Sequence, residues 1–147
     1  GHIKAGAAND NALCTIDLLP TLAKLTGSEL PKNEIDGKDV WPILSGVEGA
    51  KNPHKYYPFT IGRNLECIIS GDGKWKLHLP HSYRHVKTAG ENGFDAKYER
   101  PKIQLSLFDM KNDPYEKVNV IEKYPEIADE LKKIAAAHKT EFFSKKK

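Results

Sequence analysis

The strongest alternation of apolar and polar positions lies between residues 65 and 84. Two runs rich in β-favouring side chains, 65–70 and 75–79, flank the tetrad Gly71-Asp72-Gly73-Lys74. Tetrads of glycine and aspartate supply the positive φ angles that a tight hairpin needs. The pattern therefore predicts a β-hairpin, and Pro80 predicts the end of its second strand because proline has no N–H for a ladder.

The second predicted strand has apolar residues at every other position, which predicts one buried face. Those residues are Trp75, Leu77 and Leu79, and they alternate with Lys76 and His78. We expect the opposite face of the strand to carry these cations. Potential donors and bases are densest directly beyond Pro80, where we expect any contact with a polar or anionic ligand. They are His81, Ser82, Tyr83, Arg84 and His85.

Leucines recur at helical spacing from position 18 to position 25. Asp17 before them is a good N-cap and Gly27 after them is a good terminator, so the sequence predicts a helix between the two. The apolar stripe is too strong for an exposed helix, and we expect it to pack against another element. A catalytic role for the Asp17 carboxylate is an alternative to the cap, which is favoured.

A second helix is predicted from Glu126, with Pro125 suited to its first turn. Its acidic residues lead and its basic residues trail, as the helix dipole prefers. We expect one apolar stripe along it, formed by Ile127, Leu131 and Ile134. We also expect Phe142 and Phe143 to fold back onto this helix and the terminal lysines 145–147 to form a solvated tail.

Prolines and glycines predict irregular chain from residue 28 to residue 58, with a short helical turn at 41–44. Aromatic residues at 56, 57 and 59 predict a first strand, residues 85–100 a long loop, and residues 103–109 a further strand. Together these elements predict an α+β fold. A small antiparallel sheet of about four strands packs with the C-terminal helix and is preceded by a helix and loop segment.

The charge balance excludes one class of partner. The 147 residues carry 23 Lys and Arg against 20 Asp and Glu, a net charge of +3. Because the tail 145–147 holds three of the cations, the rest is near neutral, which argues against nucleic acid as the main partner. No apolar run approaches the roughly 18 residues of a membrane span, and we expect any export signal to lie upstream of Gly1.

Neither cysteine lies in a metal or redox motif. Cys14 and Cys67 fit no zinc spacing and no CxxC pattern, so we expect two buried unpaired thiols rather than a disulfide. The redox compartment is left open by this pattern.

The histidines at 78, 81 and 85 raise a metal hypothesis, but no regular face presents all three and no Cys or carboxylate completes a set. We therefore expect no metal site in this chain. An acid–base pair of His81 with Asp72 or Asp95 has little support. The sequence has no Gly-rich phosphate loop, no GxSxG elbow and no HExxH motif.

Several short motifs, taken in order, resemble the closing part of a sulfatase of the arylsulfatase and N-acetylgalactosamine-6-sulfatase type. In the first half these are Gly1-His2-Ile3-Lys4-Ala5-Gly6, Ile16-Asp17-Leu18-Leu19-Pro20-Thr21-Leu22 with Gly27, Asp36-Gly37, Leu44 and Gly46. In the second half they are Gly73-Lys74-Trp75-Lys76-Leu77-His78, Leu107-Phe108-Asp109, and Asn112-Asp113-Pro114 with Glu116 and Asn119. The motifs cover nearly the whole chain.

The resemblance implies a large α/β domain with a formylglycine nucleophile and a calcium ion, followed by a smaller sheet-and-helix domain. On this mapping residues 1–50 are the terminal helix and crossover of the large domain, and residues 51–147 are the C-terminal subdomain. The resemblance also makes the periplasm, the lysosome or the exterior the expected compartments.

This chain departs from the family where catalysis resides. The family nucleophile lies in a Cys/Ser-x-Pro/Ala-x-Arg motif, whereas Cys14 precedes Thr-Ile-Asp and Cys67 precedes Ile-Ile-Ser. We expect no catalytic residue, calcium ligand or formylglycine in this chain, and we expect an upstream catalytic domain to supply them. By itself the chain is expected to be inactive.

The family organisation gives the segment after Pro80 a role at the mouth of the active site. We expect His81, Tyr83 and Arg84 to contact a sulfated small molecule or glycan, with Arg84 pairing with an anionic group. For Arg84 an ordinary surface ion pair is equally favoured. Two other interpretations stay open for the chain: a non-catalytic module that binds anionic glycans, and a purely structural fragment.

Overall fold

The computed structural model describes residues 1–143. Contacts divide the chain into two compact units, one of residues 1–57 with 69–75 and the other of residues 58–68 with the chain from 76 onward. The predicted domain boundary at residue 50 concerns a larger protein and stays a prediction. The predicted lysine tail at 145–147 lies outside the described residues.

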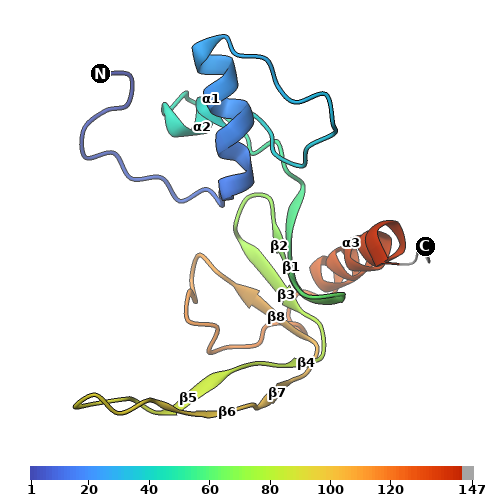
Figure 1. Cartoon of the computed structure of the whole chain (residues 1–147). Helices are drawn as coiled ribbons and strands as arrows, with labels where there is room; N and C mark the ends of the chain where they lie inside the picture. The colour runs from blue at the N-terminus through green and yellow to red at the C-terminus, as the bar shows by residue number, and fades with distance from the viewer. Residues whose placement is uncertain (144–147) are drawn as a thin grey trace. The chain divides into compact units, whose positions relative to one another are not determined.

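The first unit is built on helix α1 (Leu18–Thr26), which follows one turn of 3-10 helix, η1 (Thr15–Asp17) (Figure 1). Gly27 ends α1 with a φ of 68°, as predicted, because a residue without Cβ adopts the left-handed conformation without a clash. The predicted helical turn is confirmed as α2 (Trp41–Leu44), which buries Ile43.

Asp17 lies at the N-cap position of α1, as predicted, but its side chain makes no capping hydrogen bond there. Its fully buried carboxylate accepts a hydrogen bond of 2.9 Å from the Lys38 backbone N–H. The same oxygen lies 2.6 Å from Nε2 of His54, and the Tyr57 hydroxyl lies 3.5 Å from the other oxygen. A carboxylate withdrawn from water needs such partners. Asp17 therefore joins three separate segments of the first unit.

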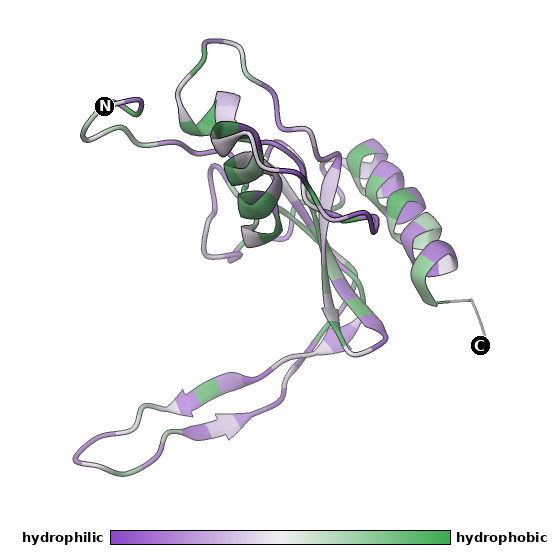
Figure 2. Ribbon diagram, turned by 45° about the horizontal axis from the view of Figure 1, so that its top comes forward, coloured by the Kyte–Doolittle hydropathy of each residue, from purple (hydrophilic) through white to green (hydrophobic). Residues whose placement is uncertain are grey.

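The leucine face of α1 is only partly covered by the described residues. Its members remain about half exposed: Leu18 50%, Leu19 52%, Leu22 55% and Leu25 47%. The buried residues of the helix are Pro20, Thr21 and Ala23 instead. Figure 2 shows the strong hydrophobic colour of α1. The described part of the chain therefore does not bury this stripe in the way that the prediction requires.

The sheet has four strands in the order β1-β2-β3-β8. The strands are β1 (Tyr56–Ile61), β2 (Asn64–Ser70), β3 (Trp75–His78) and β8 (Ser106–Asp109). The predicted hairpin is confirmed as β2 and β3, whose turn end, residues 69–75, belongs to the first unit. The most buried large apolar side chains of the sheet are Leu65, Ile68, Leu77 and Leu107. The four-stranded antiparallel sheet and C-terminal helix confirm the α+β fold.

The motif that ends in Asn119 completes the edge strand β8. The side-chain oxygen of Asn119 accepts a 3.0 Å hydrogen bond from the Leu107 N–H, and the Val120 N–H donates to the Leu107 carbonyl at 2.8 Å. These bonds satisfy ladder groups that an edge strand leaves without a partner strand.

Helix α3 (Pro125–Phe143) begins at Pro125 as predicted and lies beside the sheet in both views (Figures 1 and 2). Its buried face differs from the predicted stripe by about one residue. The buried residues are Ala128, Leu131, Ala135 and His138, whereas Ile127 and Ile134 are only partly buried. Small alanines allow the helix to approach its neighbour closely. The prediction that Phe142 and Phe143 fold back onto the helix is wrong, because α3 continues through both residues. The ring of Phe142 lies 4.5 Å from that of His138, one turn earlier in the same helix.

Two short ribbons leave the sheet after β3. One pairs β4 (His81–Ser82) with β7 (Lys102–Ile103), and the other pairs β5 (His85–Thr88) with β6 (Lys97–Glu99). The prediction of a loop over 85–100 is therefore wrong. The predicted strand 103–109 is divided, since β7 ends at Ile103 and β8 begins at Ser106. No helix in the described chain is long and apolar enough to span a bilayer.

Candidate functional site

The polar face of β3 forms a partly buried charge cluster in the second unit. Nζ of Lys76 lies 2.5 Å from one carboxylate oxygen of Glu116, and Nε2 of His78 lies 2.7 Å from the other. The Lys76 side chain is 17% exposed and that of Glu116 25%. The face does carry the predicted Lys76 and His78, but Glu116 covers them.

His78 is not a cation at neutral pH. Burial is the main cause that lowers its pKa below 6.5, and the positive charge of Lys76 adds to that effect against the opposing pull of Glu116. The contact between His78 and Glu116 is close but poorly aligned. Neither ring nitrogen therefore has a hydrogen-bond partner among the described residues. Its ring packs edge-on against Phe108 at 5.6 Å.

Glu116 has an unusual backbone conformation, with a φ of 55°. A residue with a Cβ atom adopts this left-handed region at a cost of about 1 kcal/mol. Its N–H donates to the Asp113 carbonyl at 3.1 Å, which closes the turn. The turn aims the carboxylate at Lys76 and His78, and the ion pair with Lys76 compensates for the strain.

His81 lies against this cluster with its ring stacked on His78 at 5.3 Å. Its Nδ1 donates to the Leu79 carbonyl at 2.7 Å, which fixes a proton on that nitrogen. Nε2 lies 3.8 Å from a carboxylate oxygen of Glu66. The ring is almost fully buried, at 5% exposure, so it presents little surface to a ligand.

Tyr83 and Arg84 point to opposite sides of the chain. The Tyr83 ring lies 6.4 Å from the ring of His81 and 6.3 Å from that of His85, which makes a row of alternate residues along one face. The Arg84 guanidinium stacks instead on Tyr98, 3.5 Å from its ring centre. The structure thus groups His81 with Tyr83 and separates Arg84 from both. Their binding role stays a prediction.

A shallow depression of about 240 Å³ lies where β4 pairs with β7. Its lining comes from both strands and the residues next to them: Pro80, His81, Ser82, Lys102, Ile103 and Gln104. It is an open dent rather than an enclosed cavity. Lys102 is the cation at its rim, and sequence reasoning did not select it, because it lies far from His81 along the chain.

The structure gives little support to an acid–base pair of His81 with Asp72 or to a metal site. The Asp72 carboxylate accepts hydrogen bonds from the Ser70 hydroxyl and the Lys74 N–H and is part of the hairpin turn, not a partner of His81. Among residues 1–143, no three His, Cys, Asp or Glu side chains gather as a metal site would require. The sequence also missed Glu116 as a partner of His78, since only the turn geometry brings the two together.

Both cysteines are free thiols, as predicted. Burial raises the pKa of the Cys67 thiol to about 11, which keeps it protonated and unreactive at neutral pH. Cys14 is only partly buried, so the expectation of burial holds for Cys67 alone.

Several known proteins are similar to the chain, although no family model matches it. It is 33% identical over 141 residues to arylsulfatase A of Bos taurus, which covers 88% of this chain and 26% of that protein. It is 38% identical over 128 residues to steryl-sulfatase of Homo sapiens, which covers 78% of this chain and 21% of that protein. The chain therefore spans about a quarter of the length of these relatives.

Two solved structures share its fold. One is a 6S-sulf protein of a Bacteroides thetaiotaomicron locus for the metabolism of multiple glycosaminoglycans, with a TM-score of 0.54 and 26% identity over 84% of this chain and 24% of that chain. The other was solved with its substrate D-glucosamine-2-N,6-O-disulfate and has a TM-score of 0.53 and 21% identity over 94% of this chain and 26% of that chain.

Proposed function

Because this chain belongs to the sulfatase family, we propose that it is the C-terminal part of a formylglycine-dependent sulfuric ester hydrolase. In this proposal it borders the substrate-binding mouth, while the nucleophile and the metal are held elsewhere in the protein. The observation that carries the proposal is the similarity to arylsulfatases and steryl-sulfatase over most of this chain but only a quarter of theirs.

The exposed leucines of α1 support a partner domain. Four leucines that are about half exposed on one helix form an apolar face of a kind that globular proteins normally cover. In the proposal, the upstream catalytic domain of the same protein covers this face. Burying one leucine stabilises a protein by about 1.5–3 kcal/mol, so the face is a substantial part of that contact.

The residues of this chain do not fit the formylglycine or calcium that the family implies. Formylglycine requires a Cys or Ser in the family motif, and the environment of Cys67, with its pKa raised to about 11, is that of a core thiol. Calcium requires several oxygen ligands around one point, and the described residues offer no such group. Both groups are accordingly assigned to the upstream domain.

In the proposal, the substrate contacts lie around the depression between β4 and β7. His81 forms part of its wall, Tyr83 is 42% exposed nearby, and Arg84 carries an exposed guanidinium suited to a sulfate or carboxylate. The buried ring of His81 acts mainly by holding this wall in place. A sulfated small molecule or glycan is the substrate class.

The test uses the full-length protein and release of sulfate from a small aryl sulfate and from a sulfated monosaccharide. Wild-type protein is expected to hydrolyse at least one of them. Arg84→Ala is expected to raise KM about tenfold, the effect of losing one charged hydrogen bond of about 1.4 kcal/mol. Lys87→Ala, which removes an equal charge from the same ribbon, is the control. Absence of hydrolysis by the wild type contradicts the sulfatase proposal, and unchanged KM in Arg84→Ala contradicts the mouth role.

The domain contact has its own test in the same protein. Leu22→Ser is expected to lower the free energy of unfolding by about 1.5–3 kcal/mol, because the leucine is buried in the complete enzyme. Leu30→Ser is the matched control, since Leu30 is a similarly exposed loop leucine, 45% against 55%. Equal effects of the two substitutions would show that α1 has no special partner.

The second candidate function is a non-catalytic module that binds anionic glycans. The exposed cations of the ribbons favour this module, because they can bind an anionic sugar without a catalytic nucleophile. The two candidates differ in one outcome: this module binds a sulfated sugar without releasing sulfate from it.

A further inference from the structure

The two ribbons after β3 share one register from His81 to Val86, and an irregularity shifts the pairing only beyond that point, between Val86 and Thr88. His81 pairs with Ile103 and Ser82 with Lys102, while His85 pairs with Glu99 and Val86 with Tyr98. The same register carried through the gap places Tyr83 opposite Pro101, and the Tyr83 N–H indeed donates to the Pro101 carbonyl at 3.2 Å. The gap exists because Pro101 has no N–H to return that bond. The register therefore places Arg84 directly opposite Arg100.

Alternation then sorts the side chains of this ladder into two faces. Ring contacts confirm one face, which holds His81, Tyr83 and His85. Glu99 lies on that face as well and pairs with Lys87 at 3.7 Å. The stacking of Arg84 on Tyr98 confirms the other face, because the two are diagonal neighbours across the strands.

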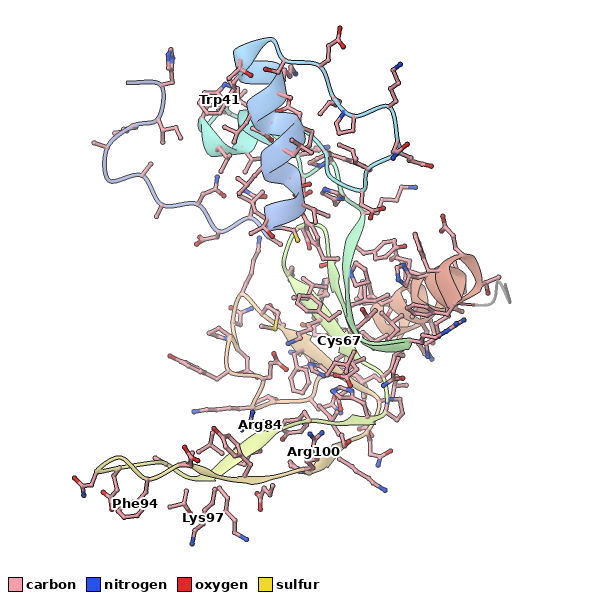
Figure 3. The ribbon with its side chains drawn as sticks, viewed as in Figure 1. Trp41, Cys67, Arg84, Phe94, Lys97 and Arg100 are labelled. Atoms are coloured by element: carbon pink, nitrogen blue, oxygen red, sulfur yellow. The ribbon has the colours of Figure 1, made fainter. Side chains whose placement is uncertain are left out.

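The second face is named here the basic strip. It consists of Ser82, Arg84 and Val86 from one strand and Tyr98, Arg100 and Lys102 from the other. It has three cations and no carboxylate, and none of the three has an ion pair with a described residue. Figure 3 labels Arg84 and Arg100 on the ribbon. Lys102 continues the strip to the rim of the depression.

The basic strip is unfavourable without a ligand. Like charges directly opposite each other destabilise a strand pair, and Arg84 and Arg100 occupy a position between the hydrogen-bonded pairs, where Cα atoms are only about 4.5 Å apart. Stacking on Tyr98 holds one face of the Arg84 guanidinium and leaves its N–H edge free for an oxyanion. Both features favour a ligand with anionic groups at close spacing.

We propose that the basic strip binds the sulfate and carboxylate groups of a sulfated glycan chain, in a line from Tyr98 to the depression beside Ser82. The identity of the anion as a sulfated sugar rests on the proposed function, whereas the anion site rests on the register and charges alone. A glycan is favoured over nucleic acid because the strip is short and the chain as a whole is close to neutral. Arg100 and Lys102 thereby join Arg84 as specificity residues.

The test measures binding of the full-length protein to a heparin-derived hexasaccharide by isothermal titration calorimetry. The double variant Arg84→Gln/Arg100→Gln is expected to lower the affinity at least tenfold and to weaken its dependence on salt. Lys87→Gln/Lys97→Gln is the control, since it removes the same charge from the same ribbon but from the opposite face. The contact of Lys87 with Glu99 places it on that face, and Lys97 lies there because it is two residues from Glu99 along the strand. Equal losses in the two double variants would overturn the proposal, because general charge would then explain binding.

Two further arms separate this proposal from its premise. De-sulfated hexasaccharide is expected to bind at least tenfold more weakly than the sulfated form, and a DNA oligonucleotide of equal charge is not expected to displace the sulfated form at equal concentration. Displacement by the DNA would overturn the proposal as a glycan site. The control variant Lys87→Gln/Lys97→Gln is expected to hydrolyse a small aryl sulfate at the wild-type rate, which shows that the loss of two charges from the ribbon leaves the rest of the protein folded. A wild-type protein that binds selectively through the strip but releases no sulfate contradicts the proposed function alone.

Discussion

Removal of the Glu116 carboxylate gives the sharpest test of how this chain is held together. Glu116→Ala leaves Lys76 and His78 without their common partner, at contacts of 2.5 and 2.7 Å. Breaking a fully buried ion pair costs about 3–5 kcal/mol. Because these side chains retain some exposure, 17% for Lys76 and 25% for Glu116, water offsets part of that cost. We expect a loss of about 2–3 kcal/mol in the free energy of unfolding.

The backbone conformation of Glu116 allows a second test, in which the stability of a glycine variant is compared with that of an alanine variant. At a φ of 55° an alanine carries the left-handed strain and a glycine does not. We therefore expect Glu116→Gly to be more stable than Glu116→Ala by about 1 kcal/mol. At an ordinary loop position the order is reversed, since glycine gains more freedom in the unfolded chain.

The assay is urea unfolding of the full-length protein, together with hydrogen exchange at the amides of β3 and β8, which reports the local free energy of opening. A double-mutant cycle with Lys76→Met isolates the ion pair, and we expect a coupling energy of about 1–2 kcal/mol. Additive effects of the two substitutions, or an alanine variant more stable than the glycine variant, would refute the reasoning.

Three further predictions concern single groups. Stability is expected to fall as the pH drops below 6.5, because the lowered pKa of His78 lets the unfolded state bind the proton first; His78→Gln should flatten this fall in urea titrations at pH 5–7. Gly71→Ala is expected to destabilise by about 1–3 kcal/mol, since its Cβ would lie 1.9 Å from the His54 carbonyl oxygen; a melting temperature equal to the wild type would contradict that contact. Cys67 is expected to react with a thiol reagent far more slowly than Cys14 in the folded protein and at the same rate in urea, and equal native rates would place Cys67 at the surface.

The parts of the fold that the sequence predicted are those set by local chemistry. The hairpin turn, the glycine end of α1 and the proline start of α3 each depend on residues within one turn or strand. The position of Asp17 at the N-cap was predicted, but the role of its side chain was not, because tertiary structure brings its partners, His54 and the Lys38 N–H, to it. An N-cap and a buried carboxylate look alike in a sequence, since both place an aspartate before an apolar helix.

The predicted loop at 85–100 failed for a related reason. Its strands are short, exposed on both faces and rich in charge, so they lack the apolar alternation that marks a strand packed on a core. Their pairing comes from the partner strand rather than from burial. The missing N–H of Pro101 also interrupts the hydrogen bonds between the two strand pairs, so β4 with β7 and β5 with β6 look like separate elements.

The candidate site illustrates how adjacency in sequence differs from adjacency in a strand. His81, Tyr83 and Arg84 form one cluster when the chain is written as letters, but in extended chain Arg84 faces away from Tyr83. The residues that share a face with Arg84 come from the other strand, and the register identifies them as Tyr98, Arg100 and Lys102. A site carried by a ribbon is therefore defined by its register, and a shift of one residue would exchange its two faces. Pro101 marks this point of the register, because the pair that it forms with Tyr83 keeps one hydrogen bond instead of two, directly beside the position where Arg84 and Arg100 lie opposite each other.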